Sequence, residues 1–196
     1  MHYLLSPLQE EQSPRPPLAG AILQGGVSDR EAFIMLLPEG VYESSVQVAV
    51  KYVSEGRGED VLPTQVRGLF FSDVAITARR WLSLTSPPPA HNGEDDYFSS
   101  DFGEERLKGT FGRIGATQTP IQILYGEKDQ YVPESVNKKD LVDRWERAIR
   151  EGGGMVDEDS GIMKGADHTV EARGDQGVED LVGRVVRFLE RIESRI

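Results

Sequence analysis

The sequence predicts an α/β fold in which a parallel sheet carries helices on both faces. Short apolar segments alternate with longer segments whose apolar residues recur at helical spacing, which is typical of such sheets. The segment Ile121–Tyr125 is mostly apolar between Pro120 and Gly126, as expected of a strand buried on both sides. With 196 residues the chain is long enough for one domain with a hydrophobic core.

The first third of the chain predicts one strand and two helices. Residues 1–17 lead from the last turn of a helix into a proline-rich loop, and residues 18–24 (LAGAILQ) predict the first full strand. Ser28 and Glu31 have the spacing of a capping box, which predicts a helix over Arg30–Leu37. One face of a second helix is marked by Val46, Ala49, Val50 and Val53.

The middle of the chain is less regular. Ser72-Asp73 is expected to cap a helix that carries Val74 and Trp81 and that Pro87-Pro88-Pro89 ends. The segment His91–Gly103 is polar, acidic and aromatic, with no period of either kind. A long irregular segment inside a compact domain is typical of a lid or a binding loop, or of a segment that is simply mobile. Its carboxylates leave cation binding open, although a solvated loop explains them more simply.

The last third has the clearest pattern. The strand Ile121–Tyr125 is followed by an amphipathic helix that is expected to open at Pro133 and to end at Gly152-Gly153-Gly154. A weaker strand is expected around Gly161–Lys164. The most regular helix comes last, with an apolar stripe made of Val178, Leu181, Val182, Val185, Phe188, Leu189 and Ile192.

Composition argues against several classes of function. A net charge of −11 disfavours nucleic acid and anionic membrane surfaces as partners. The sequence contains no cysteine, which excludes disulfides, thiolate nucleophiles and thiolate metal sites. No apolar run approaches the roughly 20 residues of a membrane span, and Met1–Leu5 lacks the features of a signal peptide. We therefore expect a cytoplasmic protein with no membrane or nucleic-acid partner.

Two polar side chains at predicted strand ends form the candidate site. Asp129 follows the strand Ile121–Tyr125, and His168 stands in a Gly-Ala-Asp-His turn after the next predicted strand. Loops at the carboxyl ends of strands carry the working side chains of open α/β sheets. The chain order Asp then His is that of the last two members of a Ser-His-Asp triad. The histidine would move the proton of the nucleophile, and the aspartate would fix the tautomer of the ring.

Each of these residues also has a plainer interpretation. His168 could be a loop histidine that only packs, and Asp129 could be a turn residue that binds nearby backbone amides. Asp29 also follows a strand end, but its place in the capping box explains it without catalysis. Glu127 and Asp167 are expected to be solvated neighbours. The pairing of Asp129 with His168 favours the catalytic interpretation.

No nucleophile accompanies this pair. The G-x-S-x-G pattern of a nucleophile elbow is absent from the sequence. Ser28, Ser72 and Ser135 stand at predicted helix starts, where a hydroxyl caps the helix. Ser99 and Ser100 lie in the acidic segment without an elbow around them. None of the five is expected to be a nucleophile.

Other chemistries find less support. Gly25-Gly26-Val27-Ser28 does not have the form G-x-G-x-x-G, and the sequence contains no P-loop. Asp157–Gly161 has part of a calcium-loop pattern, but His168 occupies the position of the bidentate glutamate. We therefore expect no cofactor and no metal.

Three stretches resemble a known family. YGEKDQYVP around Asp129 and GADH at His168 resemble the acid and histidine motifs of α/β-hydrolase-fold serine hydrolases. LAGAILQGGVSDREA, residues 18–32, is similar to the fungal siderophore esterases of the fusarinine C esterase type. The resemblance extends over most of the chain from about Leu18. It implies a carboxylic ester hydrolase that uses Asp129 and His168 on a small-molecule ester such as a hydroxamate siderophore.

The resemblance also implies that part of the parent fold is missing. In that family the nucleophile elbow lies just before this region, so residues 1–196 would form a single partial α/β-hydrolase domain, the C-terminal portion, with a helical and loop lid at about 60–115. The nucleophile, the oxyanion-hole loop and the first strands would then be lacking, and we expect the chain alone to be inactive. The alternative is a non-catalytic α/β-hydrolase-like domain that binds a partner through the open sheet edge at residues 18–24.

Overall fold

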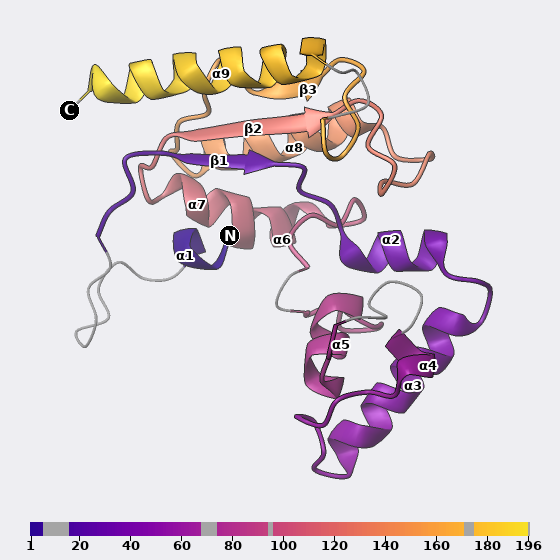
Figure 1. The fold of residues 1–196 in the computed structure, drawn as a ribbon. Coiled ribbons are helices and arrows are strands. Elements are labelled where there is room, and N and C mark those ends of the chain that lie inside the picture. Colours follow the sequence, from indigo (N-terminus) through magenta and orange to yellow (C-terminus); the bar gives the residue numbers. More distant parts are fainter. Residues whose placement is uncertain (6–15, 68–73, 94–95, 171–174, 196) are drawn as a thin grey trace. The chain divides into compact units, whose positions relative to one another are not determined.

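The computed structural model describes residues 1–5, 16–67, 74–93, 96–170 and 175–195 (Figure 1). Contacts divide the chain into two compact units. The sheet unit contains Met1–Gly26, Ser100–Gln130 and Glu134–Ile196, and the helical unit contains Val27–Ser99 and Tyr131–Pro133. None of the helices in the described ranges is long and apolar enough to cross a bilayer.

The sheet unit is built on three parallel strands in the order β1-β2-β3, which confirms the predicted α/β fold with a parallel sheet. Their bounds are Ala21–Gln24 for β1, Ile121–Gly126 for β2 and Gly161–Met163 for β3. Its helices are α1 (His2–Leu5), α6 (Glu104–Leu107), the π-helix η1 (Lys108–Gly112), α7 (Arg113–Gly115), α8 (Lys138–Glu151) and α9 (Asp175–Glu193). Helix α9 lies on one face of the sheet, and α7 and α8 lie on the other (Figure 1).

Strand β2 is the centre of the sheet unit, and all six of its residues are buried. Its side chains alternate between the two helical layers, as the pleat of a strand requires. Tyr125 meets the edge of the Trp145 ring of α8, with 5.6 Å between ring centroids. On the opposite face, Gln122 donates to the backbone carbonyl of Arg184 in α9 at 3.1 Å. Burial on both faces explains why the strand has an almost continuous apolar sequence.

Strand β1 is shorter than the predicted strand at residues 18–24, and it lies at one edge of the sheet. The backbone N–H of Ala21 donates to Pro120 O at 2.9 Å, and that of Gly25 donates to Leu124 O at 3.0 Å. Because alternate residues of a strand direct their peptide groups to opposite sides, the N–H and C=O of Ile22 face away from β2. No strand in the described part of the chain pairs with that edge.

Helix α8 begins later than expected. The sequence placed its start at Pro133, whereas the structure begins it at Lys138. The carboxamide oxygen of Asn137 accepts from the backbone N–H groups of Lys139 and Asp140 at 3.1 and 3.2 Å, so it satisfies two amides that the first turn leaves without a helical partner. Proline tolerates a helix start but does not fix one, so the cap decided the boundary.

The π-helix η1 and helix α7 approach α8 closely enough to exclude side chains at two glycines. A Cβ on Gly152 would overlap the backbone carbonyl of Gly112, and one on Gly115 would overlap the carbonyl of Ile149. Next to this contact, Phe111 stacks on Trp145 with 5.2 Å between ring centroids. The sequence marked Gly152 only as a helix end, but the packing of these helices requires it as well.

Helix α9 confirms the predicted C-terminal helix, and arginines on it bind the loop before β3. Arg191 holds the Asp157 carboxylate through two hydrogen bonds of 2.8 Å, and Arg187 holds Asp159 through two of 2.9 Å. These ion pairs account for the acidic sequence at Asp157–Gly161 without a calcium ion. Part of the predicted apolar stripe is exposed rather than buried, namely Val178, Val182 and Leu189, together with Val186.

The helical unit contains α2 (Asp29–Leu36), α3 (Val41–Ser54), α4 (Thr64–Arg67) and α5 (Ala78–Thr85). Ser28 caps α2 as predicted, because its Oγ accepts from the Glu31 N–H at 3.2 Å. Phe33 of α2 stacks on Trp81 of α5 at 5.3 Å, and the indole N–H of Trp81 donates to Ser45 Oγ at 3.1 Å. The core of the unit therefore forms where α2, α3 and α5 meet.

Helix α5 also starts later than expected. The predicted cap, Ser72-Asp73, lies outside the described residues. In the structure the cap is Thr77, whose hydroxyl accepts from the Arg80 N–H at 3.2 Å, and Val74 stands exposed before the helix. The apolar stripe predicted the helix, but a hydroxyl nearer to Trp81 fixed its first turn.

The acidic segment His91–Gly103 is anchored by buried polar groups. Ser99 and Asp96 are 0% and 4% exposed, so the solvated loop expected here is wrong for both. Ser99 Oγ lies 2.7 Å from Ser28 Oγ and donates to the Asp96 carboxylate, which in turn lies 3.6 Å from Arg30 Nε. We call these four side chains the clasp. The clasp joins the first residues of the segment Val27–Ser99 to the last.

Candidate active site

The structure brings Asp129 and His168 together. The Nδ1 atom of His168 lies 2.9 Å from Oδ2 of Asp129, although 39 positions separate the two residues in the chain. The Asp129 side chain is fully buried, whereas the imidazole is 30% exposed. A buried carboxylate therefore holds one ring nitrogen, while part of the ring reaches the surface.

The arrangement of the strands in the sheet brings Asp129 and His168 together. Because β2 and β3 are adjacent and parallel, their carboxyl ends lie at the same edge, and each loop leaves from there. The loops are joined by backbone bonds from Glu127 N–H to Met163 O at 3.1 Å and from Lys128 N–H to Ala166 O at 2.8 Å. A Cβ on Gly126 would lie 2.6 Å from the Asp167 carbonyl, so this contact between the loops requires a residue without a side chain.

Two charged side chains reinforce the loops. The Glu127 carboxylate accepts from the Gly165 N–H at 2.7 Å, so this exposed residue is not merely the solvated neighbour that we expected. Lys138, the first residue of α8, donates to the backbone carbonyls of Glu127 and Asp129 at 3.0 and 2.8 Å. Neither contact could be inferred from the sequence, because both go to peptide groups that any residue carries.

Strand β1 supplies the third side of the site. Gly25, directly after the strand, has φ +59°, a conformation that glycine adopts without strain. A Cβ at this position would lie 3.3 Å from Cε1 and 3.4 Å from Nδ1 of His168. The imidazole therefore packs against a backbone segment with no side chain, a role that the sequence did not reveal.

The geometry suits a histidine that transfers protons. When Nδ1 carries the proton of the neutral imidazole and donates a hydrogen bond to the carboxylate of Asp129, the free lone pair of the ring is on Nε2. Such a nitrogen can accept a proton from a hydroxyl and return it to a leaving group. The contact with Asp129 would stabilise the imidazolium formed between these steps.

The candidate serines have other contacts or lie elsewhere. Ser28 caps α2 and is bonded to Ser99 within the clasp. Ser135 is exposed, and Asn137 rather than Ser135 caps α8. Ser72 lies outside the described residues. The absence of a nucleophile from this chain stays a prediction from the sequence.

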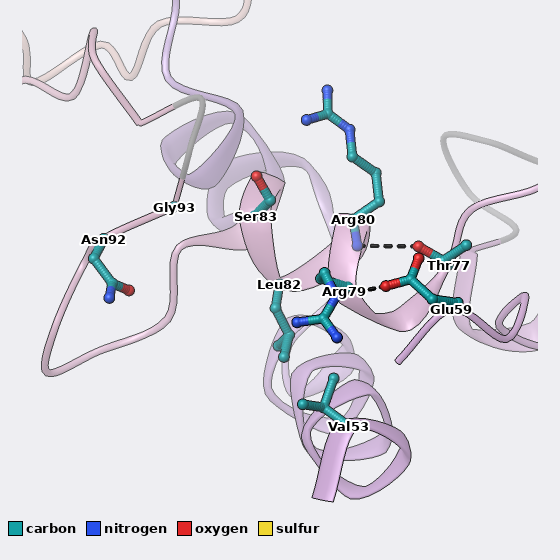
Figure 2. A pocket seen from close by; sticks show the side chains of 9 residues that line it. All are labelled: Val53, Glu59, Thr77, Arg79, Arg80, Leu82, Ser83, Asn92 and Gly93. Atoms are coloured by element: carbon teal, nitrogen blue, oxygen red, sulfur yellow. Dashed lines mark hydrogen bonds and ion pairs between the residues drawn. The ribbon is translucent and has the colours of Figure 1, made fainter. Parts of the chain in front are cut away.

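A separate cleft of about 450 Å³ lies in the helical unit (Figure 2). Val53 and Leu82 supply its apolar wall, and Arg79, whose Nε donates to Glu59 at 2.6 Å, also lines it. Neither member of the Asp–His pair lines this cleft. In the described ranges, no group of three or more histidine, aspartate or glutamate side chains is arranged to hold a metal ion.

Comparison with known proteins places this chain in a family. A family model described as protein of unknown function (DUF1749) matches residues 1–190. Esterase AN6793 of Emericella nidulans is 36% identical over 92% of this chain and 54% of its own length. Fusarinine C esterase sidJ of Aspergillus fumigatus is 35% identical over 98% of this chain and 63% of its own length.

A solved structure agrees with the sequence relatives. Siderophore hydrolase EstB from Aspergillus fumigatus matches 97% of this chain with a TM-score of 0.82 and 33% identity. This chain covers 63% of that structure, so it spans between 54% and 63% of these three relatives. The chain belongs to the family described as protein of unknown function (DUF1749), and it is an α/β-hydrolase-fold relative of the fungal siderophore esterases.

Proposed function

We propose that the chain contributes to the hydrolysis of carboxylic esters by a serine mechanism, with Asp129 and His168 as the acid and histidine of the triad. The observation that carries the proposal is the 2.9 Å contact between a buried carboxylate and a partly exposed imidazole. The plainer interpretations are weaker, because Asp129 directs its carboxylate to the ring and His168 is not buried in the core.

In the proposed reaction, Nε2 of His168 takes the proton of a serine hydroxyl as its oxygen attacks the ester carbonyl. The same nitrogen then protonates the departing alcohol, and an acyl-serine remains. Water, deprotonated by His168, attacks the acyl group and releases the carboxylic acid and the serine. Asp129 keeps the ring oriented and stabilises the imidazolium in both halves. The sequence assigns no serine to this role, and we predict that residues 1–196 do not supply it.

The proposed substrate is a small-molecule ester, and specifically an ester bond of a siderophore. Support comes from the relatives, two of which are named fusarinine C esterase and siderophore hydrolase and are 35% and 33% identical to this chain over the aligned residues. The region at about 60–115 is proposed as the lid over that substrate. Residues 60–99 of this region lie in the helical unit and the remainder in the sheet unit.

Esterase assays and the sequence of the transcript test the proposal. The purified 196-residue protein should not turn over p-nitrophenyl esters. Sequencing the transcript upstream of Met1 should find an in-frame G-x-S-x-G, and the longer product should hydrolyse both p-nitrophenyl acetate and fusarinine C. His168→Ala should abolish that activity, while Gln118→Ala, which removes a carboxamide that donates to the Gly153 carbonyl at 2.9 Å, should leave it intact. A longer product whose activity survives His168→Ala would refute the assignment.

A non-catalytic binding domain is the second candidate. It is favoured by the outer edge of β1 and by the exposed apolar side of α9, which a strand and an apolar helix of a partner would fit. Under this alternative, no upstream G-x-S-x-G would be found, and His168→Ala would leave the binding of the partner unchanged.

A further inference from the structure

His168 is held through its peptide groups as well as through its ring. Its backbone N–H donates to the side-chain oxygen Oε1 of Gln130 at 3.2 Å. Its backbone carbonyl accepts from the side-chain nitrogen Nε2 of Gln24 at 3.0 Å. The first glutamine directly follows Asp129, and the second is the last residue of β1, so the two bonds come from different strand ends.

These two bonds help to fix the orientation of the His168 ring. A single bond from Nδ1 to Asp129 does not fix a ring that is 30% exposed, because the backbone of a loop residue can still rotate. When both the N–H and the C=O of His168 are bonded, the orientation of its Cα–Cβ bond is determined. Only the two side-chain torsions then remain, and the contacts with Asp129 and Gly25 select their values.

We propose that Gln24 and Gln130 are positioning residues that hold His168 with Nδ1 directed at the carboxylate of Asp129. Their importance for ester hydrolysis rests on the proposed function, but the positioning itself is a property of the folded chain. Both side chains act on the peptide groups of His168, and neither would touch the reacting atoms.

The two glutamines have opposite parts in their bonds. Gln24 acts as a donor to a carbonyl, and Gln130 acts as an acceptor from an N–H. A glutamate can replace an acceptor but cannot donate when it is ionised, and a lysine can donate but cannot accept. Gln130→Glu and Gln24→Lys should therefore preserve the bonds, whereas Gln130→Lys and Gln24→Glu should break them.

The experiment measures how fast the Nδ1 proton of His168 exchanges with water. It uses NMR of the ¹⁵N-labelled 196-residue protein at pH 7. Asp129→Ala identifies the signal, because it removes the acceptor. We expect exchange of this proton with water to be about tenfold faster in Gln24→Glu and in Gln130→Lys, as for the loss of one hydrogen bond. Gln24→Lys and Gln130→Glu should stay within about twofold of wild type.

Charge and folding are controlled within the set. Each position receives one negative and one positive substitution. If charge alone changed the exchange rate, the two glutamate variants would therefore behave alike, and so would the two lysine variants. Gln118→Ala is the matched control, because its carboxamide donates to the Gly153 carbonyl at 2.9 Å within the same unit. It should leave the exchange unchanged, and melting curves followed by circular dichroism confirm that each variant is folded.

Two results would overturn the proposal: equal exchange in all four variants, or exchange that follows the sign of the charge and not the donor or acceptor role. Because the measurement requires no turnover, it is separate from the test of function. A positive NMR result with an inactive longer product would reject ester hydrolysis and leave the positioning role in place.

Discussion

Asp129 is held through its side chain as well as through its backbone, and this limits how its loop can move. Its carboxylate holds Nδ1 of His168, while its backbone carbonyl accepts from Lys138 at 2.8 Å. The second bond connects the loop to the first turn of α8, whose own start is fixed by Asn137. A carboxylate held in this way stays in place when the ring moves, so it can define the position to which the imidazole returns.

The backbone of Gly25 supports the imidazole of His168. Gly25→Ala should destabilise the fold by about 1–2 kcal/mol, because alanine is strained at φ +59°. The new methyl group should also press on the imidazole and weaken the NMR signal of the Nδ1 proton. Urea unfolding and the NMR spectrum measure the two effects.

Gly40 offers the matched control for this prediction. Its φ is +75°, and a Cβ there would meet nothing within 4 Å. Gly40→Ala should therefore show the loss of stability without any change at His168. If the Nδ1 signal of Gly25→Ala were as strong as that of Gly40→Ala, the proposed contact between residue 25 and the ring would be wrong.

Part of the site could be predicted from residue types, and part could not. Asp129 and His168 were found because an acid and an imidazole at successive strand ends form a specific chemical pattern. Gln24, Gln130 and Lys138 were missed because they bind peptide groups, which every residue has, so their partners leave no trace in the sequence. Only the register of the sheet and the path of the loops bring these partners within reach.

At the scale of the element, the contact of η1 and α7 with α8 depends on residues without side chains. Backbone meets backbone there, with Gly112 against Gly152 and Gly115 against Ile149. The close approach brings Phe111 over Trp145, and that ring in turn reaches Tyr125 of β2. The position of β2, and with it the loop of Asp129, therefore depends on glycines that lie outside the strand.

We expect Gly152→Ala to destabilise the protein by more than 2 kcal/mol, because the methyl group would overlap a backbone carbonyl that cannot move alone. Gly109→Ala is the control. Residue 109 lies in the π-helix η1 with open space around its Cβ position, so its substitution should be neutral or slightly stabilising. Chemical denaturation of both variants measures the difference, and equal stabilities would show that η1 and α8 can separate without cost.

The ion pairs of α9 predict a dependence of stability on pH. Hydrogen bonds from Arg187 first, and from Arg191 second, lower the pKa of Asp159 well below its usual range. Because the folded pKa is below the unfolded value of about 3.9, the contribution to stability is complete above about pH 5. It is lost as the pH falls toward the folded pKa, where Asp159 becomes protonated.

Asp159→Asn should therefore reduce the free energy of unfolding by about 1 kcal/mol at pH 7, a value that allows for solvent screening of a partly exposed pair. The difference from wild type should shrink progressively below pH 5. Urea unfolding at a series of pH values measures it. A difference that stayed constant from pH 7 to pH 3 would mean that the carboxylate charge is not its cause.

The elements themselves were predicted unequally, for physical reasons. Strand β2 was predicted because burial on both faces gives it an almost continuous apolar sequence, and helix α9 because its apolar residues recur at helical spacing. The starts of α5 and α8 were wrong because a boundary depends on one cap, and Thr77 and Asn137 competed with other polar residues nearby. The burial of Asp96 and Ser99 was missed because their partners, Arg30 and Ser28, lie about 70 positions earlier.

At the scale of the whole molecule, exposed apolar surface is the feature that most favours association with other chains. Val178, Val182, Val186 and Leu189 are each at least 45% exposed, and their spacing places them along one side of α9. Ile22 of β1, on the face of the sheet that α9 covers, is 37% exposed. An apolar helix side and an open strand edge both favour association with other chains.

We therefore predict that the 196-residue protein self-associates, and that Val182→Glu reduces this self-association at least severalfold. Val50→Glu is the control, because Val50 is similarly exposed on α3 in the helical unit. Sedimentation velocity at several concentrations distinguishes the two variants. An equal response to both substitutions would show that general charge, and not the side of α9, controls association.

The clasp affects which changes of sequence the molecule can tolerate during evolution. Ser28 and Ser99 are in contact, so the segment between them begins and ends at the same place. The number of residues in this segment is therefore not constrained by the rest of the chain. Residues can be gained, lost or exchanged within it while the strand before and the helix after keep their places. Swapping this stretch between homologues, with the four clasp side chains retained, is therefore a practical way to re-engineer one portion of the protein without rebuilding the other.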